Sequence, residues 1–200
     1  MSSQTNDEDL VLIDRISEQD KSAFELLYRR YYGRVFHFVL RMVQQRELAE
    51  EVVDDTLFAI WRTSVSFQRR SSVSTWIFGI AYRQGLTAIS RQSRRSEIDN
   101  DQQALAEVTH VDDQYDLSRS ISSNELFNEL SKAVAALSTD HKAIIELAAL
   151  GHNATEIGQI VQCSSATART RLFYARRKLK ACLAESDDTI KSARTGTNDE

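Results

Sequence analysis

Proline and glycine, the residues that most often interrupt helices, are scarce in this sequence. The chain of 200 residues contains no proline and only six glycines. Apolar residues recur at intervals of three and four positions almost throughout, which is the period of amphipathic helices. These features favour helices over strands joined by tight turns. We therefore expect an all-α protein.

Cysteine and long apolar runs are scarce as well. Cys163 and Cys182 lie 19 positions apart, without a CxxC motif and without a histidine at metal-ligand spacing. Neither a disulfide framework nor a zinc site is indicated, so both are expected to be ordinary thiols. Nowhere does an apolar run approach the roughly 18 residues of a membrane span, and the amino terminus is acidic where a secretory signal would be basic. We expect a cytoplasmic protein without membrane insertion.

The common motifs of catalysis are also missing. The sequence has no glycine-rich phosphate loop and no GxSxG motif, and its four histidines form no recognisable pattern. Those histidines are His37, His110, His141 and His152. The sequence thus predicts a protein that is not an enzyme and that needs no cofactor or metal.

Charge is separated by sign along the chain, although the net charge is only -4. Residues 62–96 contain seven arginines and no acid, and residues 164–181 contain six lysines or arginines and no acid. Residues 97–129 hold nine acids against one arginine, which predicts a solvated linker up to about residue 120. Both ends, residues 1–20 and 183–200, are acidic, and we expect them to be frayed.

Two small helical domains joined by a flexible acidic linker follow from this pattern. In the first, the apolar spacing predicts helices over about residues 24–42, 47–62 and 75–94. The predicted divisions are an acidic amino-terminal segment 1–20, a first domain 21–96, the linker 97–123, a second domain 124–183 and an acidic tail 184–200.

The segment from Thr155 to Leu179 has the pattern of a helix-turn-helix. Asn153 and Glu156 form a capping-box pair at the start of a short helix, and Ser164 or Ser165 would cap a longer one. A buried stripe is predicted along the longer helix at Ala168, Leu172, Ala175 and Leu179.

The outer faces of this longer helix are basic, and a helix of this size fits the DNA major groove. Residues near its amino-terminal end, Ser165, Thr167 and Arg169, are candidates for base readout, whereas later residues would contact phosphates. A solvated basic helix without a ligand is the alternative interpretation. The predicted contacts with duplex DNA are Ser165, Thr167, Arg169, Thr170, Arg171, Phe173, Arg176 and Lys178.

In the first basic block, arginines alternate with aromatic residues, a combination that holds single strands by base stacking and phosphate attraction. We assign Phe78 mainly to packing, and Trp76 equally to packing and to DNA. The predicted contacts with a single strand are Phe67, Arg69, Arg70, Trp76, Arg83, Arg91 and Arg94.

Four carboxylates, Glu50, Glu51, Asp54 and Asp55, form the acidic patch of the first domain. Glu50 with Asp54 and Glu51 with Asp55 are separated by four positions, so they point outward from a helix. A hydrolytic metal site would need them to converge in a pocket, and no histidine is near. A metal-dependent nuclease is therefore a less favoured interpretation than a docking surface.

Three stretches in this order resemble the extracytoplasmic function sigma factors of the sigma-seventy family. They are ELAEEVVDDTLFAIW, STWIFGIAYRQGLTAISRQSRR and the helix-turn-helix, and the resemblance covers about residues 20–180. It implies a sigma-two domain and a sigma-four domain that give bacterial RNA polymerase its promoter specificity. Two positions depart from the family pattern: Ser138 stands where proline is usual, and Gln162 stands where glycine is usual. A left-handed Gln162 would cost on the order of 1 kcal/mol.

The resemblance also implies partners and roles. The acidic patch would dock on the polymerase clamp, the second domain would read an upstream duplex element, and the first would capture the melted downstream element. Core RNA polymerase, promoter DNA and an anti-sigma factor would be the partners, and the free protein should bind DNA poorly. The main competing interpretation is a stand-alone helix-turn-helix regulator, which usually needs a dimer interface.

Overall fold

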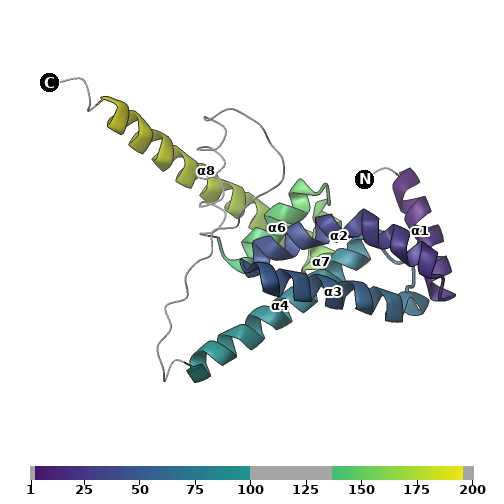
Figure 1. Cartoon of the computed structure of the whole chain (residues 1–200). Coiled ribbons are helices and arrows are strands. Elements are labelled where there is room, and N and C mark those ends of the chain that lie inside the picture. Colours follow the sequence, from purple (N-terminus) through teal and green to yellow (C-terminus); the bar gives the residue numbers. More distant parts are fainter. Residues whose placement is uncertain (1–2, 100–136, 196–200) are drawn as a thin grey trace.

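The computed structural model of the chain describes residues 3–99 and 137–195, with side chains for 5–95 and 137–181. Within these ranges the protein is helical and contains no strand, which confirms the all-α prediction. Figure 1 shows the arrangement of the helices. The elements are α1 (Ser3–Ser17), α2 (Lys21–Val43), α3 (Arg46–Thr63), the 3-10 helix η1 (Ser64–Ser66), α4 (Val73–Asp99), α6 (Thr139–Ala149), α7 (Ala154–Ile160) and α8 (Ser165–Thr195).

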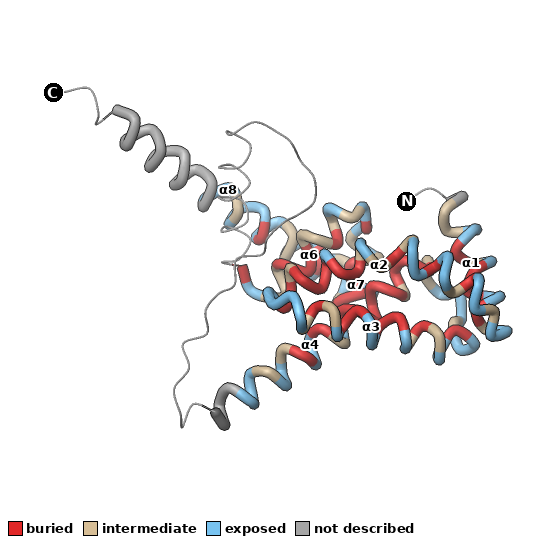
Figure 2. The backbone as a smooth tube through the Cα atoms, viewed as in Figure 1, coloured by how far each residue is buried: buried red, intermediate tan, exposed pale blue. Residues whose placement is uncertain are grey.

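Helices α2, α3 and α4 form the bundle that the periodicity predicts for the first domain. The Asp20 carboxylate accepts hydrogen bonds from the backbone N–H groups of Ser22 and Ala23 (2.8 and 3.2 Å), which caps the start of α2. The helix ends where Gln44 takes a left-handed conformation, with φ 60°. The three helices pack against one another, and Figure 2 shows buried residues recurring along each of them.

Helix α1 contradicts the prediction that the amino-terminal end is frayed. Residues 3–17 are helical, and Leu12, Ile13 and Ile16 are buried against the bundle. The prediction was wrong because it was based on the many acids of residues 1–20. It gave too little weight to a short apolar stripe in the same segment. Once that stripe is buried, the acids simply occupy the solvent-facing side of an amphipathic helix.

One acid of α1 lies inside the protein, where its charge is compensated by another helix. Asp9 is only 1% exposed and accepts hydrogen bonds from the Arg30 guanidinium (2.6 Å) and from the Tyr31 hydroxyl. Glu8 also pairs with Arg30, at 3.0 Å. A buried carboxylate is tolerated only with such partners, so Asp9 fixes how α1 sits on α2.

The helix-turn-helix has the local structure that the sequence predicts. The Asn153 side chain accepts hydrogen bonds from the backbone N–H groups of Thr155 and Glu156, and the Glu156 carboxylate accepts one from the Asn153 N–H. This is a complete capping box. Before it, Gly151 has φ 90° and ends α6 as expected.

The turn between α7 and α8 contains the left-handed Gln162, with φ 58°. Ser164 precedes α8, and its hydroxyl accepts a hydrogen bond from the Thr167 N–H (3.0 Å), so the cap is Ser164 and not Ser165. The predicted stripe on α8 is confirmed at Ala168 and Ala175, which are each 1% exposed, whereas Leu172 and Leu179 are only half-buried.

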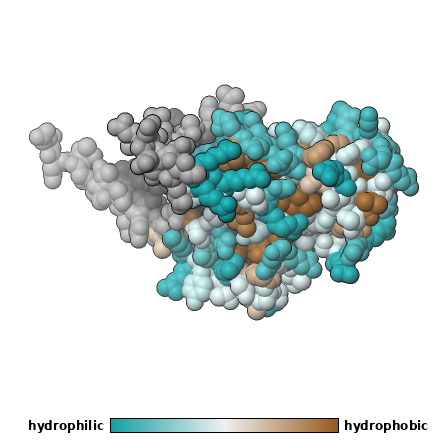
Figure 3. All heavy atoms as spheres, turned by 90° about the horizontal axis from the view of Figure 1, so that it is seen from below, coloured by the Kyte–Doolittle hydropathy of each residue, from teal (hydrophilic) through white to brown (hydrophobic). Residues whose placement is uncertain are grey.

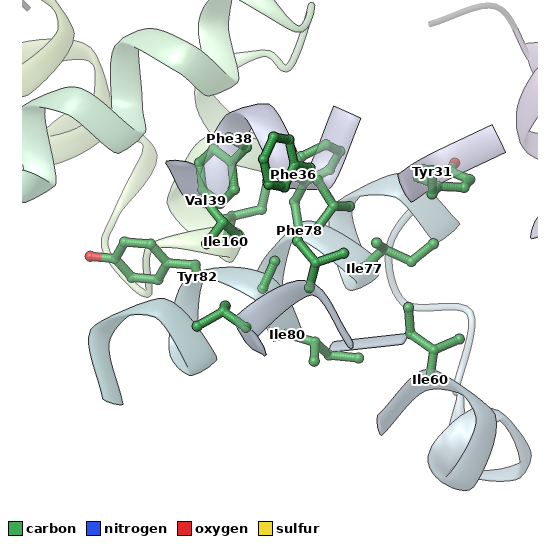
Figure 4. Close-up of a cluster of buried hydrophobic side chains, with 14 of the residues drawn as sticks. Tyr31, Phe36, Phe38, Val39, Ile60, Ile77, Phe78, Ile80, Tyr82 and Ile160 are labelled. Carbon is green, nitrogen blue, oxygen red and sulfur yellow. The ribbon is translucent and has the colours of Figure 1, made fainter. Parts of the chain in front are cut away.

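Both helix groups contribute to one hydrophobic core. Helix α6 packs against α2, and α7 packs against α4. Ile160 of α7 lies beside Phe38, Val39 and Phe78 of the first bundle, as Figure 4 shows, and the Phe38 and Phe78 rings meet edge to face at 5.3 Å. The predicted division into two domains therefore corresponds to two helix groups in direct contact.

Part of the predicted organisation concerns residues that the structure does not describe. The linker 97–123 and the first part of the predicted second domain, residues 124–136, lie almost entirely outside the described residues. Helix α8 continues to Thr195, so much of the tail expected to be frayed continues that helix. None of the described helices is both long enough and apolar enough to span a membrane.

Candidate polymerase and nucleic-acid interfaces

The acidic patch lies on α3. Two of its carboxylates face α2 and the other two face α4. Glu50 and Asp54 lie towards α2, where their charges help to raise the pKa of Tyr32, after burial and Tyr28. Glu50 is half-buried and pairs with the Arg46 guanidinium at 3.1 Å, whereas Asp54 is exposed. This half of the patch is a surface of acids beside an aromatic ring.

An aromatic ladder on α2 borders this half of the patch, and the sequence analysis missed it. The Tyr28 and Tyr32 rings stack at 5.0 Å, and the Tyr32 and Phe36 rings at 6.2 Å. The Arg46 guanidinium lies over Phe36, 5.4 Å from the ring centre. Aromatic residues at successive intervals of four positions were the available signal, but this spacing equally fits a buried stripe.

Glu51 and Asp55 line a cleft between α3 and α4, and the opposite wall carries Arg91 and Arg95. All four side chains are exposed. Arg91 was predicted to contact DNA, and the structure places it on the same cleft as two acids predicted to contact polymerase. The two predicted surfaces therefore meet at this cleft.

The strand loop, residues 67–72 between η1 and α4, carries three of the seven residues predicted to contact a single strand, and the other four lie on α4. Phe67 and Trp76 are half-buried and lie with their ring centres 4.9 Å apart. Arg69 and Arg70 are exposed, and so is Arg83, about two helical turns beyond Trp76 on α4. The arrangement places half-buried aromatic rings next to exposed cations, the combination that binds single strands.

Two other aromatics of this block serve the core. Phe78 is fully buried, as predicted, and Tyr82 is only 5% exposed. The Tyr82 hydroxyl donates a hydrogen bond to Asp140 of α6 at 3.1 Å. Burial and the Asp140 carboxylate raise the pKa of Tyr82 to about 12, so this phenol stays protonated at neutral pH. Tyr82 belongs to the contact between the helix groups and is unavailable for stacking.

The outer face of α8 presents the residues predicted to contact duplex DNA. Arg171 is the exception, because it is half-buried and its guanidinium pairs with Asp140 at 3.1 Å. Ser165 is half-buried at the start of the helix. The others are exposed: Thr167, Arg169, Thr170, Phe173, Arg176 and Lys178.

A buried histidine lies where α7 meets α4. His152 Nε2 is 3.4 Å from the Ser74 hydroxyl, and its ring packs edge to face against Phe78 at 5.2 Å. Burial lowers the pKa of His152, Glu156 raises it, and Arg34 lowers it further. The imidazole is therefore neutral at pH 7 and serves as a packing residue between the helix groups.

A metal centre does not form among the described residues, since no three potential ligands gather there. The acidic patch points outward on both sides of α3, as predicted. Figure 3 shows that hydrophilic and hydrophobic surface alternate across one face of the molecule. The arrangement fits contact surfaces for macromolecules.

Comparisons with known proteins indicate the family to which this fold belongs. The family model Sigma-70 region 2 matches residues 27–95, which contain α3 and most of α2 and α4. The chain is 28% identical over 177 residues to the ECF RNA polymerase sigma-E factor of Haemophilus influenzae, covering 86% of this chain and 93% of that protein. It is also 28% identical over 171 residues to the RNA polymerase sigma factor YlaC of Bacillus subtilis, covering 83% and 95%.

The chain belongs to the extracytoplasmic function sigma factors. Its fold agrees with the sigma factor RpoE of Bartonella quintana, solved in complex with the anti-sigma factor NepR. That structure matches with a TM-score of 0.66 at 22% identity and covers 80% of this chain and 96% of that one. In this sigma factor, region 2 includes the acidic patch and the strand loop. Because the similarity to relatives extends over both helix groups, it favours this family over a stand-alone regulator.

Proposed function

We propose that this sigma factor binds core RNA polymerase through the acidic patch and directs it to promoters by two DNA contacts. The strand loop and α4 capture the melted downstream strand, and α8 reads an upstream duplex element. The observation that carries the proposal is that one chain presents three surfaces of different chemistry outside its shared core: acidic on α3, aromatic and cationic at the strand loop, and basic on α8.

Polymerase docking is supported by the exposure of three of the four acids of the patch, Glu51, Asp54 and Asp55. Asp54 and Asp55 are solvent-exposed and project from a helix that is otherwise anchored in the core. Opposite charge on a partner would accelerate the encounter and fix its orientation. The proposed contacts are Glu50, Glu51, Asp54 and Asp55.

Capture of the melted strand is supported by the Phe67 and Trp76 pair, which lies next to exposed arginines. A base leaving the duplex gains stacking against an aromatic face, and its phosphates gain cationic contacts. The proposed contacts are Phe67, Arg69, Arg70, Trp76, Arg83, Arg91 and Arg94.

Readout of the upstream element is supported by the exposed first turns of α8. Thr167 and Arg169 lie where a recognition helix contacts base edges, and Arg176 and Lys178 lie further along, where phosphates run. The proposed contacts are Ser165, Thr167, Arg169, Thr170, Arg171, Phe173, Arg176 and Lys178. The sigma factor itself catalyses no reaction in this proposal, because polymerase performs the chemistry.

An anti-sigma factor is a further proposed partner. The fold is that of a sigma factor solved with such a partner. Any protein that covers the acidic patch or the strand loop would block the proposed contacts with polymerase and DNA.

The proposal is tested by assembling core RNA polymerase with the full-length chain. We expect the chain to copurify with core polymerase, and the complex to start transcription from specific sites on fragmented genomic DNA. Polymerase alone should not use these sites. Permanganate footprinting at the sites should detect melted thymines. Failure to bind core polymerase would contradict the proposal.

A further inference from the structure

Helix α1 contacts the strand loop, although more than 50 positions separate the two in the chain. It packs on η1, which leads into the loop, and on α4, which follows it. Its own position does not depend on the loop, because Asp9 binds Arg30 and Tyr31 of α2 and an apolar stripe is buried against the bundle. Helix α1 is therefore a fixed support beside a loop of irregular backbone.

The first contact is at the end of the loop. The backbone N–H of Val73, the first residue of α4, donates a hydrogen bond to Asn6 Oδ1 at 3.1 Å. Helix N-termini have N–H groups without intrahelical partners, and such groups are normally capped by a residue next to them in the chain. At α4 the neighbouring Ser72 hydroxyl accepts a hydrogen bond from the Thr75 N–H (3.1 Å), and Asn6, 67 positions away, supplies an additional acceptor for Val73. Asn6 thereby ties the start of α4 to α1.

The second contact is in the middle of the loop. The Arg69 guanidinium lies 2.6 and 2.7 Å from the two carboxylate oxygens of Asp14. Arg69 has φ 55°, a left-handed conformation that residues other than glycine rarely adopt. The ion pair with Asp14 stabilises this backbone conformation and holds the guanidinium on the α1 side of the loop.

We propose that α1 positions the strand loop for base selection, with Asn6 and Asp14 as positioning residues. The inference rests on the proposed capture of the melted strand by this loop. Asp14 has two effects on that capture. It selects one conformation of the loop, and its negative charge offsets the positive charge that Arg69 would present to any phosphate.

Removing the Asp14 charge should therefore separate selectivity from affinity. In Asp14→Asn, the loop samples other conformations, and Arg69 becomes free to bind phosphates without regard to sequence. We expect the preference for the selected strand over a scrambled one to fall about two- to five-fold, the range that an exposed ion pair can support. Binding to the scrambled strand should strengthen and become more dependent on salt.

The experiment uses holoenzyme made from core RNA polymerase and the full-length chain. A pool of single-stranded oligonucleotides of random sequence is selected by wild-type holoenzyme, and the most enriched sequence and its scrambled version are then used as ligands. Dissociation constants for both are measured across a salt series for the wild type, Asp14→Asn, Arg69→Gln and the double variant. Thermal unfolding of each variant is measured in parallel.

Two comparisons test whether Asp14 and Asn6 affect selectivity by positioning the strand loop. Asp14→Asn should lower selectivity only when Arg69 is present, so it should have no further effect in the Arg69→Gln background. Asn6→Asp keeps an acceptor for the Val73 N–H and should retain selectivity, whereas Asn6→Ala should lose it. The control Glu25→Gln removes an equally short exposed ion pair, with Arg29 on α2 (2.6 Å), and should change nothing.

The outcomes separate this inference from the proposed function. Unchanged selectivity in Asp14→Asn, or an equal loss in the Arg69→Gln background, would overturn the role of α1 and leave strand capture intact. A holoenzyme that forms normally but enriches no sequence from the pool would overturn strand capture, and the role of α1 with it.

Discussion

Single residues at the turn between α7 and α8 determine whether the helix-turn-helix can close. Gln162 adopts the left-handed conformation there, at a cost of about 1 kcal/mol that packing of the surrounding helices offsets. Gly158 faces the other side of the turn, and a Cβ built on it would lie 2.6 Å from the carbonyl oxygen of Cys163. The turn thus tolerates a side chain at Gln162 but not at Gly158.

Gly158→Ala should therefore destabilise the protein. The methyl group would collide with backbone, which cannot move aside as a flexible side chain can, so we expect a loss of about 1–3 kcal/mol in the free energy of unfolding. Urea unfolding followed by circular dichroism measures the change.

The matched control is Gly33→Ala in α2, where the added methyl would meet no atom within 4 Å. Alanine has the higher helix propensity, so this variant should be about 0.5–1 kcal/mol more stable than the wild type. Equal effects of the two variants would mean that the close approach at Gly158 is relieved at no cost.

At the scale of elements, α4 serves the core and the proposed DNA surface at once. Ile77, Phe78 and Ala81 are buried in the bundle, while Trp76 remains half-buried against Phe67 at the end of the strand loop. A helix in this position can offer an aromatic ring to a base without loss of its core contacts. Helix α8 is divided in the same way between a buried stripe and an exposed basic face.

Trp76→Ala should slow or abolish open-complex formation, because stacking contributes roughly 1–3 kcal/mol per base. Duplex binding through α8 should change little, and a template that is already melted should partly restore activity. Permanganate footprinting follows the melting. Normal melting by the variant would show that Trp76 serves packing alone.

Arg169→Ala should weaken binding to the upstream element by about 1–3 kcal/mol and have little effect on scrambled DNA, since this residue lies in the first turns of α8. Arg176→Ala should weaken binding to both DNAs equally. It should also reduce the slope of the logarithm of the binding constant against the logarithm of the salt concentration by about one, because one phosphate contact is lost. Holoenzyme affinity for the two DNAs across a salt series measures both effects. If both DNAs lose affinity equally in Arg169→Ala, base readout belongs to other residues of α8.

At the scale of the whole molecule, the two helix groups form one folding unit in this structure. Tyr82 and Arg171 both bind Asp140, so a carboxylate of α6 connects α4 with the proposed recognition helix. His152 and Phe78 join α7 to α4 in the same interface. Loss of packing in one helix group should therefore also destabilise the other.

The buried His152 makes this interface sensitive to pH. Its pKa is lowered by burial, so the unfolded chain takes up a proton near pH 6.5 while the folded chain does not. Stability should be constant above that pH and should fall by at most about 1.4 kcal/mol per pH unit as the solution becomes more acidic, down to the lowered pKa.

His152→Gln should remove most of this dependence, whereas His37→Gln, at an exposed position of α2, should keep it. Urea unfolding at pH 7.5, 6.5 and 5.5 provides the comparison. The same pH dependence in His152→Gln would assign it to other groups.

Docking on polymerase is also a property of the whole molecule, because it depends on the charge distribution over its surface. Asp54→Lys combined with Asp55→Lys should weaken binding to core polymerase about tenfold or more at low salt, with helix content unchanged. Asp7→Lys in α1 with Glu18→Lys in the turn after it makes the same change of charge at exposed positions and should have a smaller effect. Equal losses for the two pairs would remove the acidic patch from the interface.

The sequence by itself determined the features that depend on neighbours in the chain. Helices α2, α3 and α4 follow from apolar residues at intervals of three and four, and the capping box of Asn153 with Glu156 is complete within four residues. The exposed patches on α3 and α8 follow as well, because a helix that buries one stripe leaves its charged residues on the other faces. These interactions are local, so a pattern in the sequence specifies them.

Only the tertiary structure decided which distant groups meet. Residues 1–20 read as an acidic tail, yet their apolar stripe finds a partner in the bundle, and Asp14 reaches Arg69 across 55 positions. Tyr82 lies within the first basic block of the sequence, yet it is buried and bonded to Asp140, 58 positions away. Many acids and arginines in this chain could pair with equal electrostatic benefit. The choice among them is made by the packing of the shared core, which no local pattern encodes.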